Sequence, residues 1–534
     1  MLKDGMAMEK INVDFKNTCR ILFGQEIGEL SEFAPYLSET MFPYKIARSA
    51  VSGKPVMLSG PYYPEGGRFI SQDEVGMKKA APLSINDIKD IDSLFNAASE
   101  QMAYCGNKVF GTCLDVSEVD NCADCMNVFH SHDIYSTKNA AFCSNGRLSE
   151  SLYGVNGFCR SHQCMRCAWN AGPGLGASRS FEAYGCVGTS GAYFAFNCCG
   201  CNDVMFSFNL RGKSHMIGNL QLSKEKYGSL RVKLASEMAQ SLRKDKRLFS
   251  TVDLAGGRGG KGEYSELARD AAPPAIGKAL NSCCRVVLGK EAGLPEKLEK
   301  WLLKRAIKVR KVKGMKGTPT YHSEYPMLCK VPPSQVVTLD EALADALTSK
   351  VSIGEGESPS LVEMAARAKK IALFTFEKRE GRCLDITEGP GASDSTLCHR
   401  LLYAFSNTLS GYSTVVTESK YVFGGYVRIL NSEFILSSYN LTQCKKCLEA
   451  DSSYRSSGLY FCHNCENVEE GILCFNLKGA RYAILNQPVS KEEYMRVKKM
   501  LLDYVNRELE AKGGLERSIF ALVKKQGAGQ QEKT

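Results

Sequence analysis

The chain has 534 residues, of which 44% are hydrophobic and 24% charged, and its net charge is +10. This is the composition of a globular protein, and it excludes wholesale disorder and a collagen-like fibre. The length indicates more than one core. The 23 cysteines are unusual, because the chain is far too long to be a small disulfide-stapled protein.

The placement of the cysteines suggests a reducing compartment. The N-terminal residues contain no apolar segment of the kind found in a secretory signal, and no run of apolar residues is long enough to span a membrane. An odd cysteine count with several C-x-x-C pairs then favours a cytoplasmic protein. We therefore expect the cysteines to be free thiols or metal ligands.

The sequence contains an internal repeat. The matching pairs are 193–227 with 460–494, 19–28 with 284–293, and 111–118 with 381–388. The longest pair is gapless and identical at 14 of 35 positions. Three matches in the same order, at nearly the same offset, predict a tandem duplication of the whole chain. The two units would be 1–265 and 266–534, with pseudo-twofold character within one chain.

In chain order, each predicted unit has a mixed helical segment, a cysteine-rich β-core and a closing helix. The first unit has its β-core at about 104–222, its closing helix at 223–248 and a glycine-rich linker at 255–262. The second has a basic helix at about 294–316, a β-core at about 383–489 and a closing helix at 490–511. Ser223 and Ser490 are the predicted N-caps of the closing helices.

The β-cores predict an α+β fold with repetitive strands. Strand-like runs in the second core begin every 10–14 residues and are separated by Asn, Ser and Asp. This spacing fits a β-solenoid-like stack, with a meander as the alternative. Asparagine-bearing turns, such as those at Asn464 and Asn476, would suit stacked side chains.

One motif carries a resemblance. The second unit contains C-x-x-C steps, then Phe475-Asn476-Leu477-Lys478, and then Ser490 to Tyr494. This pattern resembles uncharacterised cysteine-rich repeat proteins of uncultured bacteria and archaea. The resemblance covers the cysteine-rich third of each unit and implies a style of fold, without an activity.

Four cysteines have the spacing of a zinc site. They are Cys444, Cys447, Cys462 and Cys465, two C-x-x-C pairs 14 residues apart. Two such pairs can surround Zn²⁺ with four thiolates. The duplication provides a test, because Cys462 aligns with Ala195 in the first unit. Either one unit binds zinc or the cysteines are interior packing, since a free Cys behaves as a small hydrophobe. No other cofactor is predicted.

The charge is concentrated in the second unit. Residues 1–265 hold 29 basic and 27 acidic residues, whereas residues 266–534 hold 39 and 31. The candidate polyanion-binding residues are Lys300, Lys304, Arg305, Lys308, Arg310, Lys311, Lys313 and Lys316. Such a strip binds phosphate backbones or acidic partners, or is simply a solvated helix face.

Three functions remain open from the sequence. The first is a non-catalytic interaction or scaffold protein with a protein or ribonucleoprotein partner, rather than a small molecule. The second is a zinc-containing, sequence-nonspecific RNA-binding protein. The third is an enzyme of unknown class with a site between the units; no catalytic residue is predicted, because no His, Cys and Asp arrangement indicates an activated nucleophile.

Overall fold

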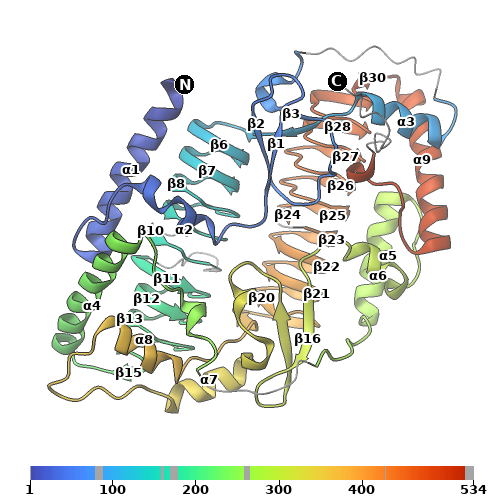
Figure 1. The fold of residues 1–534 in the computed structure, drawn as a ribbon. Helices are drawn as coiled ribbons and strands as arrows, with labels where there is room; N and C mark the ends of the chain where they lie inside the picture. The colour runs from blue at the N-terminus through green and yellow to red at the C-terminus, as the bar shows by residue number, and fades with distance from the viewer. Residues whose placement is uncertain are drawn as a thin grey trace, which may run out of the picture.

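The computed structural model describes residues 2–77, 88–157, 162–168, 178–257, 265–426 and 429–522. It contains both helices and strands, with two large open sheets that lie side by side (Figure 1). No helix in these ranges combines the length and the apolar character needed to cross a membrane. Residues 258–262 of the predicted glycine linker lie outside the described residues.

The helices flank the sheets. They are α1 (Leu2–Phe23), α2 (Ala34–Ser38), α3 (Ile91–Gln101), α4 (Lys224–Asp245), α5 (Pro274–Leu288), α6 (Pro295–Leu302), α7 (Leu339–Thr348), α8 (Leu361–Lys369) and α9 (Lys491–Lys512). Helices α1 and α4 lie beside the first large sheet, and α5, α6 and α9 lie beside the second (Figure 1). Ser223 and Ser490 are the N-caps of α4 and α9, as expected.

The first large sheet, called the first stack, follows chain order. Its strands are β5 (Val109–Phe110), β6 (Leu114–Ala123), β7 (Met126–Tyr135), β8 (Lys138–Ala141), β9 (Glu150–Tyr153), β10 (His162–Met165), β11 (Ser180–Tyr184), β12 (Ser190–Phe196), β13 (Asn202–Met205), β14 (Ser214–Ile217) and β15 (Leu220–Gln221). Neighbouring strands are parallel, except that β15 turns back on β14.

The second large sheet, called the second stack, is built in the same way. Its strands are β18 (Lys378–Glu380), β19 (Leu384–Thr387), β20 (Gly391–Ser393), β21 (Thr396–Phe405), β22 (Thr408–Thr417), β23 (Lys420–Gly425), β24 (Ile429–Leu430), β25 (Glu433–Ser438), β26 (Lys445–Leu448), β27 (Ser457–Tyr460), β28 (Glu466–Ile472), β29 (Lys478–Ile484) and β30 (Gln487–Pro488). It too ends in one antiparallel pair, β29 with β30.

Short pairs of strands lie outside the stacks. They are β1 (Lys45–Arg48) with β2 (Pro55–Leu58), β3 (Phe69–Ser71) with β4 (Tyr104–Gly106), and β16 (Val309–Lys313) with β17 (Pro319–Ser323).

Paired residues in the stacks lie mostly 12 positions apart. In the first stack, residue 114 pairs with 126, 126 with 138, and 138 with 150. The second stack repeats this spacing, with 433 opposite 445 and 445 opposite 457. Each 12-residue turn of the chain therefore lies directly on the one before it.

In the stacks the backbone has a positive φ at every third residue and changes direction there; we call these positions corners. Asn121, Asp124 and Asn127 have φ of 54°, 53° and 52°, in the left-handed region. Asn and Asp are among the few non-glycine residues that adopt this conformation readily. Asparagines at the corners also stack as expected, since the Asn464 side-chain amide donates to the Asn476 side-chain oxygen at 2.9 Å.

The residue after each corner points into the stack. Cys122, Cys125, Val128, Ser131 and Ile134 follow successive corners, and each is at most 2% exposed. The enclosed space is narrow, so it accepts small and medium side chains. A C-x-x-C pair is therefore two neighbouring inward positions of one turn.

Cysteine takes the role of serine at these positions. The Ser131 hydroxyl donates to the carbonyl of Phe129 (2.8 Å) and accepts from the N–H of Cys143, 12 residues on (3.0 Å). The Cys143 thiol makes the same backward bond to Ala141 (3.2 Å). Burial raises the pKa of this thiol to about 12, so it is an inert, hydrogen-bonded interior group.

Each predicted unit closes the stack of the other. The Asn476 side-chain amide in the second stack donates to the Ala103 carbonyl of the first unit at 3.0 Å. Reciprocally, Asn209 in the first stack donates to the Leu373 carbonyl of the second unit at 3.0 Å. Helix α3 likewise packs against α9, and α8 against α4. The two units are thus interlocked.

The basic helix expected at 294–316 is present only in its first part. Helix α6 ends at Leu302, and Val309–Lys313 forms strand β16, paired antiparallel with β17. Apolar residues at 307, 309 and 312 allow either interpretation, and the partner strand decides for the sheet.

The interior geometry makes a prediction for Cys143. Changing Cys143→Ser should lower the unfolding free energy by about 1 kcal/mol or less, because the serine hydroxyl can make the same hydrogen bonds as the thiol. Changing Cys143→Leu should cost about 1–3 kcal/mol, because the added carbons overfill the interior. Urea unfolding followed by circular dichroism measures both, and equal losses would contradict the serine-like role.

Candidate functional site

Five of the predicted polyanion-binding residues lie at the surface. Lys300 is on α6, Lys304 and Lys308 follow that helix, and Lys313 and Lys316 lie at the end of β16 and in the turn beyond it; all five are exposed. We call this set the lysine strip. Their positions leave the ammonium groups accessible to an anionic partner.

The three remaining basic residues are held by the protein itself. Arg310 forms ion pairs with Glu324 and with Glu266, the latter at 3.7 Å. Lys311 forms ion pairs with Asp270 (3.0 Å) and Glu388 (2.7 Å).

Arg305 points toward the interior. It donates to the Tyr439 hydroxyl (3.1 Å) and lies over the ring of Phe520, 4.7 Å from its centroid. Arg305, Arg310 and Lys311 therefore stabilise the fold rather than extend the strip.

The four cysteines of the predicted zinc site lie inside the second stack. Cys444 and Cys447 follow successive corners of one turn, and Cys462 and Cys465 follow two corners farther along. All four are fully buried. The Cys444 thiol donates to the Thr442 and Ser453 carbonyls, at 3.6 and 3.5 Å. Cys465 likewise donates to the carbonyls of His463 and Cys474, at 3.7 and 3.5 Å.

Within the described residues, no three His, Cys, Asp or Glu side chains are grouped so that they could hold a metal ion. The interior role of these thiols matches that of Ser131 and Cys143. Zinc binding stays a prediction of the sequence spacing alone.

A Cys, a His and an Asp do meet between the two units. The His463 Nδ1 lies 3.0 Å from Asp451 Oδ2, which also accepts from the Tyr63 hydroxyl at 2.6 Å. The His463 Nε2 lies 2.9 Å from the backbone nitrogen of Cys105. The Cys105 N–H donates to the lone pair of Nε2, and this is the lone pair with which His463 would accept a proton as a general base.

The Cys105 thiol is not activated. Burial raises its pKa to about 12, and it donates to the Gly106 carbonyl at 3.5 Å. Cys105, His463 and Asp451 are all fully buried. This group therefore fastens β4 to the second stack, and it provides no nucleophile that a substrate could reach.

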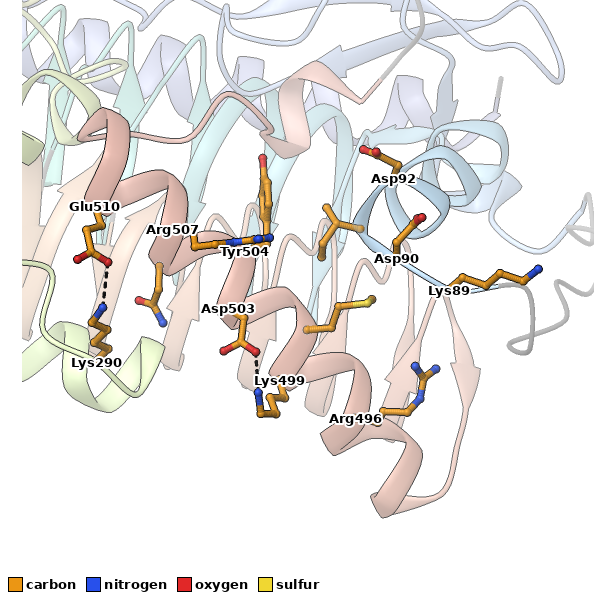
Figure 2. A pocket seen from close by; sticks show the side chains of 13 residues that line it. Lys89, Asp90, Asp92, Lys290, Arg496, Lys499, Asp503, Tyr504, Arg507 and Glu510 are labelled. Atoms are coloured by element: carbon orange, nitrogen blue, oxygen red, sulfur yellow. Dashed lines mark hydrogen bonds and ion pairs between the residues drawn. The ribbon is translucent and has the colours of Figure 1, made fainter.

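A surface groove lies along α9 (Figure 2). Its volume is about 900 Å³, and it is formed where α3 of the first unit approaches α9 of the second. The lining residues are Lys89, Asp90, Ile91, Asp92, Lys290, Arg496, Lys499, Met500, Asp503, Tyr504, Asn506, Arg507 and Glu510. We call it the α9 groove.

The charges of the groove are partly paired. Lys290 bonds to Glu510 (2.9 Å), Lys499 to Asp503 (2.7 Å), and Arg496 to Glu493 (2.6 Å). Within the described residues, Lys89 and Arg507 have no ion-pair partner, and both are exposed. The sequence interpretation missed this groove. Aligning α9 with α4 would have revealed Tyr504 and Arg507, which replace the Glu237 and Gln240 of the first unit.

Two buried carboxylates hold corresponding turns of the two units. Glu182 accepts from the Thr251 N–H (3.2 Å), and Glu449 accepts from the Ile519 N–H (3.1 Å). Thr251 and Ile519 each begin a 3₁₀ turn after a closing helix.

The surroundings of the two carboxylates differ. Glu182 also receives the Tyr36 and Tyr184 hydroxyls, at 3.0 and 2.9 Å, and the Arg166 guanidinium at 3.2 Å. Within the described residues, no cation lies within ion-pair distance of Glu449. Burial raises the pKa of Glu449 to about 7, and the nearby Arg305 opposes this only in part.

These surroundings predict opposite effects of two matched substitutions. The folded-state pKa of Glu449 is raised, so its stabilising contribution is present below about pH 4.5 and is lost as the pH rises to about 7. Glu449→Gln should remove that loss and raise the unfolding free energy at pH 8 by up to roughly 3 kcal/mol over wild type. At pH 4.5 the two proteins should differ little.

Glu182→Gln is the matched control. It leaves Arg166, which is 1% exposed, without its buried partner, and should cost about 3–5 kcal/mol at neutral pH. Chemical denaturation across this pH range measures both variants. A Glu449→Gln protein that is less stable than wild type at pH 8 would contradict the assignment.

Metal analysis tests the cysteines. We expect the purified chain to lack stoichiometric zinc, because the Cys444, Cys447, Cys462 and Cys465 thiols already bond to backbone carbonyls. Elemental analysis after dialysis measures the content. One zinc per chain, lost in Cys462→Ser, would instead establish the four-thiolate site.

The geometry of this chain is the sole basis for interpreting these sites. No family model, curated protein or solved structure matches the chain.

Proposed function

We propose that the chain is a tandem duplication of one unit, and that each stack is a β-solenoid of 12-residue turns. Matched contacts support the duplication. The Tyr193 hydroxyl donates to the Leu22 carbonyl of α1 (2.7 Å), and the Tyr460 hydroxyl donates to the Val287 carbonyl of α5 (3.0 Å). The resemblance to cysteine-rich repeat proteins agrees with this architecture.

The protein is a non-catalytic scaffold that binds an acidic protein or a ribonucleoprotein in the cytoplasm. The observation that carries this proposal is the lysine strip, Lys300 to Lys316, on α6 and the β16 hairpin. The corresponding first-unit region, around residues 32–54, has only Lys45, Arg48 and Lys54. One copy of the unit has therefore gained a basic surface, which is the electrostatic footprint of a polyanionic partner.

A second candidate is sequence-nonspecific RNA binding through the same strip, with zinc in the second stack if the metal analysis finds it. The exposed lysines favour it, because ammonium groups neutralise phosphates without reading bases.

The third candidate, an enzyme with its site between the units, would depend on Cys105, His463 and Asp451. The occupied lone pair of His463 counts against it.

Charge reversal tests the strip. Lys304→Glu with Lys308→Glu should abolish capture of the partner from a native extract, and raised salt should weaken capture by wild type. Lys224→Glu with Lys213→Glu, at exposed positions of the first unit, gives the same charge change and should leave capture intact.

Nuclease treatment then separates the two candidates. An acidic protein partner stays bound after RNase, whereas an RNA-mediated complex is lost. Capture that is unaffected by salt and by the strip variant would refute both.

A further inference from the structure

We infer that the α9 groove is a binding site for single-stranded nucleic acid. This inference rests on the RNA-binding candidate above and adds a second, separate contact surface to it. It names the groove residues that would hold the backbone and the residue on which a base would stack.

Five basic side chains line the α9 groove. Arg496, Lys499 and Arg507 project from one face of α9, and Lys89 and Lys290 border the groove from other elements (Figure 2). Lys89 and Arg507, both exposed, lie on different sides of the groove. Asp90, Asp92, Asp503 and Glu510 also line the groove, and two of them pair with Lys290 and Lys499. Within the described residues, Lys89 and Arg507 have no ion-pair partner, so they are the cations available to phosphate oxygens.

The second argument is the aromatic residue between these cations. Tyr504 is partly exposed and lies next to Met500 on the same face of α9. Its ring packs against Phe95, 6.4 Å between centroids, and against the Arg517 guanidinium, 6.0 Å away. These contacts fix the ring in place. A fixed aromatic ring beside unpaired cations is an arrangement that binds single strands by stacking their bases.

The third argument compares the two units. At the offset of 267, Arg496, Lys499, Tyr504 and Arg507 correspond to Ser229, Val232, Glu237 and Gln240 on α4. The first unit therefore lacks these cations and this ring at the corresponding positions. Helix α4 carries basic residues elsewhere, such as Arg231 and Lys233, so the two helices differ in where the cations lie and in the aromatic ring.

Helix α6 approaches the end of the groove. Lys290 bonds to Glu510 there, and the Lys297 ammonium of α6 donates to the Glu510 carbonyl. Lys300 of the lysine strip lies three residues after Lys297, on the same side of α6. The strip therefore begins near the groove.

The test uses the full chain and a fluorescent single-stranded RNA of mixed sequence, about 12 nucleotides long, in an anisotropy titration. Arg507→Glu should weaken binding by about tenfold and should lower the slope of log Kd against log salt. Tyr504→Leu should also weaken binding by about tenfold, whereas Tyr504→Phe should bind like wild type. Lys224→Glu on α4 is the charge-matched control and should change nothing.

Two further measurements distinguish loss of the binding site from misfolding of the variants. Thermal unfolding of each variant must match wild type, and ultraviolet crosslinking of the wild-type protein should place the RNA on the peptide that contains Tyr504. A duplex of the same sequence should bind more weakly, because its bases cannot reach the ring.

The outcomes distinguish failure of the α9 groove from failure of the RNA-binding candidate. If Lys300→Glu with Lys304→Glu abolishes binding while Arg507→Glu and Tyr504→Leu do not, the groove is excluded and the strip remains. If the wild-type chain binds no RNA but captures an acidic protein, both the groove and the RNA candidate are refuted.

Discussion

The narrow interior of the two stacks is the constraint on which the rest of the molecule depends. The chain turns at every third residue, so each 12-residue turn encloses only a few inward side chains. Cys, Ser, Val and Ala fit there, and thiols and hydroxyls can bond to carbonyls of their own turn and the next. Because side chains fill this space, a protein or nucleic-acid partner must bind outside it. The exposed basic residues lie on α6, the β16 hairpin and α9, and α6 and α9 pack against the second stack.

Polar groups beside the stacks hold the outer elements in register. Glu182 and Glu449 each anchor a 3₁₀ turn, and Asp451 with His463 anchors β4. A buried carboxylate is tolerated when enough donors surround it. Burial raises the pKa of both carboxyls, and Glu182 has a buried cation and several donors, whereas Glu449 has fewer.

Much of the architecture could be predicted from sequence, because it depends on spacing. The strand interval, the stacked Asn464 and Asn476, and the N-caps Ser223 and Ser490 follow from local patterns. Corners at Phe142 and Leu148 could not be foreseen, because neither residue favours positive φ and the stack imposes it. The C-x-x-C spacing is ambiguous for a related reason: metal-ligand pairs in zinc sites and inward positions here both recur at every third residue.

The candidate site was less predictable than the fold. The exposed lysines were visible in the sequence, but the inward turn of Arg305 depends on Tyr439 and Phe520, which lie far away in the chain. The α9 groove requires α3 of one unit to approach α9 of the other, and no local pattern encodes that approach.

Because each predicted unit closes the stack of the other, the first stack is made before the segment that covers it. The first stack leaves the ribosome well before Leu373, whose carbonyl receives the Asn209 amide at its far end. Until then an edge of paired strands remains uncovered, and such edges recruit other chains. The nascent first unit is thus prone to aggregation at this stage, and the segment that covers it follows on the same polypeptide.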